Sequence, residues 1–243
     1  METQVDVFCA RSLICRNPGT ENEQTEVVKI ITDLPVGKVY SGKQFCESVR
    51  DFCGDNGTPW GYLFHKSYLD RRGRKYIEDH LFEETDWIAY HFYNARTVYY
   101  SDIVIYKYYI NPESVMAGDM TFNYVTDSSR LAVRMMKIAD GFREESPDLV
   151  ADWYHSADRG LLNKGVRWNY LVRYPFSDIR RYHAMLGKEN VDYLKKHYRG
   201  DFFKMLMFNH RCLALLLLFI LRPLHILQWK MRGLGQMKRN FYR

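Results

Sequence analysis

Three carboxylates lie close together at the point where a helical pattern begins. Glu83, Glu84 and Asp86 open a stretch with apolar residues spaced for one helix face, which predicts a helix over 85–95. The helix dipole and the free backbone N–H groups keep a carboxylate ionised at such a position, and an ionised carboxylate can take a proton from a hydroxyl. The pattern therefore predicts either a general base or acidic residues that only stabilise the first helical turn.

The elements around these carboxylates follow from periodicity and turn residues. Short strands are predicted over 5–15, 60–64, 97–100 and 103–109, with Ser101-Asp102 between the last two. Ser41 is expected to cap a helix, and a helical turn over 67–70 is expected to end at Gly73. We therefore expect an α/β protein.

The second half of the chain is predicted to be helical. Asp127 or Ser128 is expected to cap one helix, and Ser146-Pro147 to begin another. A third helix is expected around residues 191–198. Residues 212–221 are ten consecutive apolar residues followed by Arg222-Pro223, which is too short a run to cross a bilayer. This tail is predicted to lie on an anionic membrane surface, or else to pack on the domain or on a partner.

Positive charge is concentrated at the C-terminal end. The formal net charge is +6, yet eight of the 35 basic residues and none of the 29 acidic ones lie in residues 202–243. Residues 1–201 thus hold 27 basic and 29 acidic residues, which disfavours a nucleic-acid binder and suits a basic tail that meets lipid. The five cysteines form no Cys-x-x-Cys pair, so reduced thiols in a cytosolic protein are expected. His80 and Glu84 have no third ligand at a fixed spacing, so no metal site is expected there.

Residues 59–116 resemble the C-terminal half of the catalytic domain of family 2 glycosyltransferases, the GT-A enzymes that build bacterial surface polysaccharides. The shared pattern is a tryptophan strand, a short helix with a leucine, an acidic pair opening a helix, two strands ending in tyrosines, and an Asn-x-x-Ser turn. In this chain these parts fall at residues 60–64, 67–69, 82–87, 98–100, 103–109 and 111–114. Residues 5–52 resemble the family's middle segment more weakly.

The resemblance implies a fold and a division of the chain. The expected fold is a partial GT-A-like mixed sheet with flanking helices, followed by C-terminal helices. Residues 1–118 would be the acceptor side of a glycosyltransferase domain, residues 119–200 a helical region, and residues 201–243 an apolar and basic amphipathic tail. The implied activity is inverting transfer of a sugar from a nucleotide-sugar donor to a glycan acceptor, at the inner face of the plasma membrane.

The resemblance also implies roles for particular residues. The family places a Glu-Asp pair where this chain has Glu83 and Glu84, so Glu84 is expected to be the base although it is one methylene longer than the family's Asp. Asp86 could serve instead. Trp60 is expected to pack beneath the acceptor, and Tyr108 and Tyr109 are candidates for lining the acceptor groove.

One part of the family pattern is absent. Family members hold Mg²⁺ or Mn²⁺ against the donor diphosphate with an Asp-x-Asp pair, and this sequence contains no Asp-x-Asp. We therefore expect that the donor half of the domain is missing, so that this chain either pairs with another chain that supplies it or folds poorly. The alternative is a non-catalytic protein: a truncated remnant, or a membrane-associated subunit that binds a glycan-assembly partner.

Overall fold

The computed structural model describes residues 5–28, 32–49, 59–111, 121–158, 162, 178–199, 205, 208–210, 213 and 216. These residues form a mixed α/β structure in which a curled sheet is flanked by helices, and helices follow it, as the sequence predicts. The strands are β1 (Val7–Arg16), β2 (Gln24–Val28), β3 (Lys38–Tyr40), β4 (Tyr62–Phe64) and β5 (Val98–Tyr109). The helices are α1 (Gly42–Ser48), the 3₁₀ turn η2 (Pro59–Gly61), α2 (Lys66–Arg72), α3 (Glu83–Tyr93), α4 (Phe122–Asp140), α5 (Pro147–Ser156), α7 (Asp178–Leu186) and α8 (Lys188–His197).

The sheet is built on one parallel pair of strands. β1 and β5 run parallel along nearly their whole length, and the other described pairings are antiparallel. The order is β2-β1-β5-β3, while β4 pairs with the first residues of β1. A parallel pair needs a crossover connection, and α1, α2 and α3 lie in that crossover.

Two predicted strand boundaries are wrong. The prediction of separate strands over 97–100 and 103–109 is replaced by the single strand β5. Ser101 is buried and its hydroxyl accepts from the N–H of Ile103 at 3.3 Å, while the register against β1 shifts beside Cys9 and Arg11. The polar pair therefore marks an irregularity within the strand and not a turn. Trp60, expected in a strand, belongs to η2, and the strand begins at Tyr62.

The start of α1 and the end of α2 lie where the sequence predicts. Ser41 caps α1 in a capping box with Gln44, so both residues satisfy N–H groups at the first turn. Gly73 ends α2 with φ +65°, a left-handed conformation that glycine adopts without steric cost.

The start of α4 differs from the prediction. Asp127 and Ser128 do not cap it; Thr121 does, with its hydroxyl accepting from the N–H of Tyr124 at 3.2 Å. Ser128 instead donates its hydroxyl to the carbonyl of Tyr124, one turn earlier. This bond satisfies a polar side chain inside a helix, so the residue need not mark a helix end.

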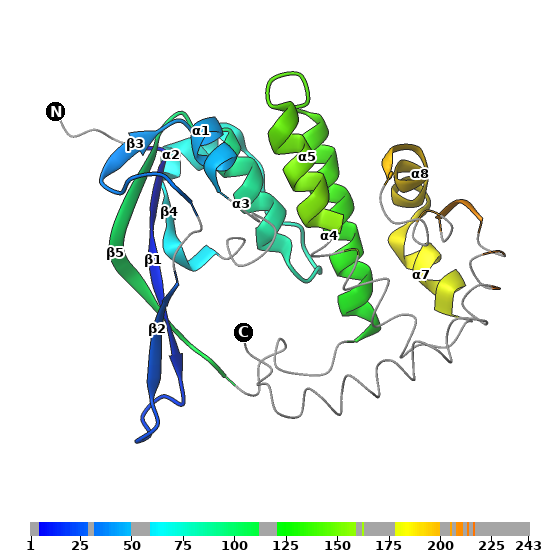
Figure 1. Ribbon diagram of the computed structural model, residues 1–243. Helices are drawn as coiled ribbons and strands as arrows, with labels where there is room; N and C mark the ends of the chain where they lie inside the picture. Colours follow the sequence, from blue (N-terminus) through cyan, green and yellow to red (C-terminus); the bar gives the residue numbers. More distant parts are fainter. Residues whose placement is uncertain are drawn as a thin grey trace.

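Helix α3 is packed between the sheet and α4. Figure 1 shows α1, α2 and α3 beside the sheet, with α4 and α5 forming the next layer and α7 and α8 beyond them. Phe92 of α3 is fully buried against Phe45 of α1 and Tyr62 of β4, with ring centroids 5.2 and 4.7 Å away. One hydrophobic cluster continues from these residues through α4 and α5 to α8, and it holds the first turn of α3 in place.

The C-terminal helices only partly test the prediction. α5 begins at Ser146-Pro147 as expected, and α8 covers most of the helix expected around residues 191–198. The apolar run over 212–221 lies outside the described residues except for Leu213 and Leu216, which are helical and exposed. None of the helices in the described ranges combines the length and the apolar character that crossing a bilayer requires.

Candidate functional site: the first turn of helix α3

The first turn of α3 is acidic and has no side-chain cap. Phe82 occupies the N-cap position in a left-handed conformation (φ +63°), and its side chain cannot accept a hydrogen bond from the helix. Glu83, Glu84 and Asp86 follow within this turn and complement the positive end of the helix dipole. The three carboxylates have very different surroundings, and these separate their roles.

Asp86 is buried and fully engaged. Its side chain is 2% exposed. One carboxylate oxygen accepts from Nη2 of Arg74 at 2.8 Å, and the other accepts from Nε of Arg134 at 3.1 Å. These bonds join the segment after α2, the first turn of α3 and the middle of α4. Asp86 is thus placed as an anchor, because a carboxylate with a guanidinium on each oxygen is poorly placed to take a proton from a substrate.

Glu84 is half-buried and has a raised proton affinity. Burial raises the pKa of its carboxyl group above the ordinary value, and the neighbouring Glu83 carboxylate raises it further, against the lowering effect of the Glu84 backbone N–H. Burial and the charges of Glu84 and Glu83 likewise raise the pKa of the Tyr76 phenol, which places all three groups in one electrostatic environment. A carboxylate whose pKa is shifted toward neutral pH is better suited to accept a proton than an ordinary one.

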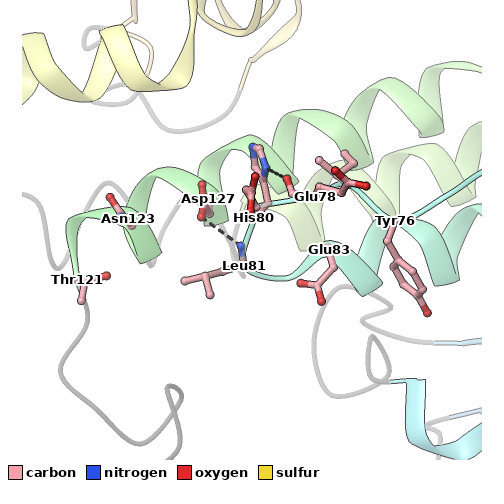
Figure 2. Close-up of a pocket in the computed structure, with 10 residues that line it drawn as sticks. Tyr76, Glu78, His80, Leu81, Glu83, Thr121, Asn123 and Asp127 are labelled. Atoms are coloured by element: carbon pink, nitrogen blue, oxygen red, sulfur yellow. Dashed lines mark hydrogen bonds between the residues drawn. The ribbon is translucent and has the colours of Figure 1, made fainter.

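An acidic hollow of about 640 Å³ opens next to this turn. Figure 2 shows its two walls, one from the segment that leads into α3 and the other from the first turns of α4. The described residues that line it are Tyr76, Ile77, Glu78, Asp79, His80, Leu81, Glu83, Thr121, Asn123 and Asp127. Of the predicted site residues only Glu83 lines the hollow, and Glu84 lies next to Glu83 in the same turn.

The α4 wall of the hollow contains residues that the sequence did not single out for function. Asp127 is buried and accepts from the backbone N–H of Leu81 at 3.2 Å and from Arg130 at 3.1 Å. The Nη1 atom of Arg130 also lies 3.3 Å from Nε2 of His80, and its Nη2 donates to the carbonyl of Met185. These bonds fix the segment before α3 against α4. No sequence signal could have shown this, since Asp127 and Leu81 are 46 residues apart.

The predicted aromatic residues form a separate cluster. Trp60 stacks on Tyr108 with ring centroids 4.2 Å apart and planes 7° from parallel, and Tyr106 lies 6.2 Å away on the same strand. Tyr109 is 51% exposed, with the ammonium group of Lys107 4.9 Å from its ring. Successive strand residues face opposite sides of a sheet, so Tyr109 points away from the Trp60 stack. Within the described part of the chain, none of the predicted aromatic residues Trp60, Tyr108 and Tyr109 lines the acidic hollow.

The described residues do not form a recognisable metal site. Across the described ranges, no three His, Cys, Asp or Glu side chains come together in an arrangement that could hold an ion. The described residues therefore provide no set of ligands for the Mg²⁺ or Mn²⁺ that the family resemblance implies.

Comparisons with protein-family models, with curated proteins and with solved structures found no match to this chain. The protein is therefore defined by its fold and site, as a mixed α/β protein with an acidic helix N-terminus beside an open hollow.

Proposed function

We propose that this chain is a family 2 glycosyltransferase-like protein in which Glu84 activates an acceptor hydroxyl. The activity would be inverting transfer of a sugar from a nucleotide-sugar to a glycan acceptor in surface polysaccharide synthesis. The observation that supports it best is the raised pKa of Glu84 in a half-buried helix N-terminus beside an open hollow. The resemblance of residues 59–116 to that family supplies the reaction class.

The three carboxylates would divide the work. Glu84 would take the proton of the acceptor hydroxyl as the hydroxyl oxygen attacks the anomeric carbon. The bond between that carbon and the nucleoside diphosphate breaks, and the nucleoside diphosphate leaves with the electron pair. Glu83 lines the hollow and would orient the acceptor, and its negative charge raises the proton affinity of Glu84. Asp86 would hold the turn in place through Arg74 and Arg134. The Trp60–Tyr108 stack would offer a flat apolar face to a sugar ring.

The test is nucleotide-sugar turnover by the full chain. Release of the nucleoside diphosphate would be measured with a panel of UDP- and GDP-sugars in the presence of Mn²⁺ and glycan acceptors. Removal of a general base costs a factor of about 10² to 10⁴, so Glu84→Gln should lower kcat on that scale, and Glu84→Asp should keep part of the activity. Glu78→Gln is the matched control, because Glu78 is an exposed residue of the hollow wall. A Glu84→Gln variant as active as the wild type would disprove the role of Glu84.

A non-catalytic role is the second candidate, favoured by the lack of an Asp-x-Asp pair in the sequence. The chain would then be a truncated remnant, or a membrane-associated subunit that binds a glycan-assembly partner. Calorimetric titration with UDP- and GDP-sugars separates the two candidates. If the wild-type chain binds none of them at millimolar concentration, it is not an enzyme by itself and the second candidate stands.

The proposed location is the cytoplasmic face of the plasma membrane. Its support is the basic, acid-free sequence of residues 202–243 with its short apolar run. Sedimentation with vesicles of anionic lipid should retain the chain at low salt and release much of it at high salt, whereas vesicles of neutral lipid should retain little. Equal retention by both lipids would contradict the electrostatic part of this proposal.

A further inference from the structure

A second hollow lies between α3 and α4 and has the opposite electrostatic character. Its volume is about 410 Å³, and its described lining residues are Arg74, Tyr90, Arg134, Lys137, Ile138, Gly141 and Phe142. Three of these carry a positive charge and none carries a negative one. The remainder are apolar or aromatic, apart from the phenol group of Tyr90. No described residue lines both this hollow and the acidic one.

The positive charge of this hollow is only partly neutralised. Arg74 and Arg134 share a single carboxylate, that of Asp86, so the three groups together keep a net positive charge. Lys137 lies 2.5 Å from the carboxylate of Glu189, but that side chain is 87% exposed. Solvent therefore screens this ion pair, and water can replace the lysine as the partner of Glu189.

Arg134 has unused hydrogen-bonding capacity. A guanidinium group has five N–H donors, and the Nε donor of Arg134 is given to Asp86. Its Nη2 is shielded from solvent and has no acceptor among the described residues. A buried donor without an acceptor is unfavourable, so a small movement of the Arg134 side chain that brought Nη2 to a ligand oxygen in the hollow would form a charge-assisted bond and remove that cost.

The aromatic and apolar walls restrict the shape of a ligand. The guanidinium of Arg74 lies 4.7 Å from the centroid of the Tyr90 ring, which holds both groups along one side. Ile138 and Phe142 supply apolar surface next to the cations. A bare inorganic ion would use the charges but not this surface.

We propose that the hollow between α3 and α4 binds a small organic anion: a phosphate or carboxylate group attached to a ring or a short apolar group. The anionic oxygens accept from Arg134 and are attracted by Lys137 and Arg74, and the apolar part contacts Ile138, Phe142 and Tyr90. Binding involves no covalent step, and it does not depend on sugar transfer at Glu84. Because Arg74 and Arg134 also hold Asp86, an anion bound here touches the same network that fixes the first turn of α3.

The test is a calorimetric titration of the full chain with phenyl phosphate as the probe. Inorganic phosphate and phenol serve as comparison ligands that carry one half of the probe each. We expect phenyl phosphate to bind more tightly than either. Lys137→Gln should weaken binding of phenyl phosphate about fivefold, the scale of one partly exposed charge contact. Arg134→Lys, which keeps the charge beside Asp86 but loses the planar fork, should also weaken it.

Two controls make the result decisive. Lys66→Gln removes a cation whose side chain is 87% exposed and is not among the described residues that line the hollow, and it should leave binding unchanged. Arg71→Gln alters a different basic hollow, formed by Asp6, Tyr68, Arg71, Arg72 and Arg96, and should also leave binding unchanged. The proposal is overturned if phenyl phosphate binds no better than phenol, or if Arg71→Gln abolishes binding while Lys137→Gln does not change it.

Discussion

The imidazole of His91 provides a pH-dependent test of how α3 is packed. His91 has no exposed surface and lies among aromatic rings, with the centroid of Trp87 4.2 Å away and that of Tyr68 5.6 Å away. Its Nε2 lies 3.5 Å from the carbonyl oxygen of Arg74, and its Nδ1 has no partner among the described residues. Burial lowers the pKa of His91 from 6.5 to about 4, and the charges of Arg74 and Arg72 add to this effect.

The direction and size of the effect follow from these two pKa values. Between pH 6.5 and pH 4 the unfolded chain binds a proton at this residue while the folded chain does not. The free energy of unfolding therefore falls as pH falls through this window. At about 1.4 kcal/mol for each tenfold difference in proton affinity, the loss attributable to His91 is at most about 3 kcal/mol.

The assay is urea unfolding of the wild type and of His91→Phe, monitored by tryptophan fluorescence at pH values from 4 to 7.5. Phenylalanine fits among the same rings and cannot be protonated, so the variant should lose about 2 to 3 kcal/mol less than the wild type on acidification. His210→Gln, which removes an exposed imidazole, should follow the wild type. Identical pH dependence of the wild type and His91→Phe would refute the reasoning.

Three further predictions concern the stability of the same region. Asp86→Asn should lower the free energy of unfolding by about 2 to 3 kcal/mol in urea, because two partly buried guanidinium groups lose their shared carboxylate; a loss below about 1 kcal/mol would contradict the anchoring role. Glu84→Gln should stabilise the protein at pH 7, because the raised pKa means that the charged carboxylate is unfavourable in the folded state. This gain should fade as pH falls from the raised pKa of Glu84 toward the ordinary value of 4.5 and be absent below it, and a gain that persists at pH 3 would argue against its electrostatic origin. Gly42→Ala should lower the free energy of unfolding by about 2 kcal/mol, since an added Cβ would collide with the carbonyl oxygen of Phe92 and lie 2.7 Å from that of Ala95. Gly141→Ala, whose Cβ would lie 3.2 Å from the nearest carbonyl oxygen, should cost much less, and equal midpoints in calorimetric melting would contradict this packing argument.

Local patterns in the sequence predicted the local structure. The helix expected over 85–95 lies at Glu83–Tyr93, because its apolar residues repeat with the helical period and face the sheet and α4. The cap at Ser41 and the helix end at Gly73 also depend on interactions within a few residues. Such features can be read from a single sequence because both partners lie in the same short window.

The prediction was wrong where polar residues lie inside regular elements. Thr126, Ser128 and Ser129 bond to carbonyl groups one turn earlier in α4, so a cluster that is typical of a helix start occurs within a helix. Ser101 is accommodated similarly by an irregular register within β5. Whether such a residue ends an element depends on partners that periodicity does not reveal.

The candidate site depended on contacts between distant residues. In the sequence Asp86 is an acidic residue like Glu83 and Glu84, and its bonds to Arg74 and to Arg134, 48 residues away, distinguish it as an anchor. The α4 wall of the acidic hollow, and the second hollow between α3 and α4, likewise exist only because α3 packs on α4. The sequence predicted where the acidic turn lies, but not that Asp86 is the carboxylate held between two guanidinium groups.

The central claim is that Glu84 activates the acceptor hydroxyl. Its most direct test is the acceptor-dependent release of nucleoside diphosphate by the wild-type chain and by Glu84→Gln, measured side by side at pH 7. If Glu84 is the base, the wild type releases nucleoside diphosphate only when an acceptor is present, and the variant releases it at least about a hundredfold more slowly. The account is contradicted if the wild type shows no acceptor-dependent release with any donor, or if both proteins release it at the same rate.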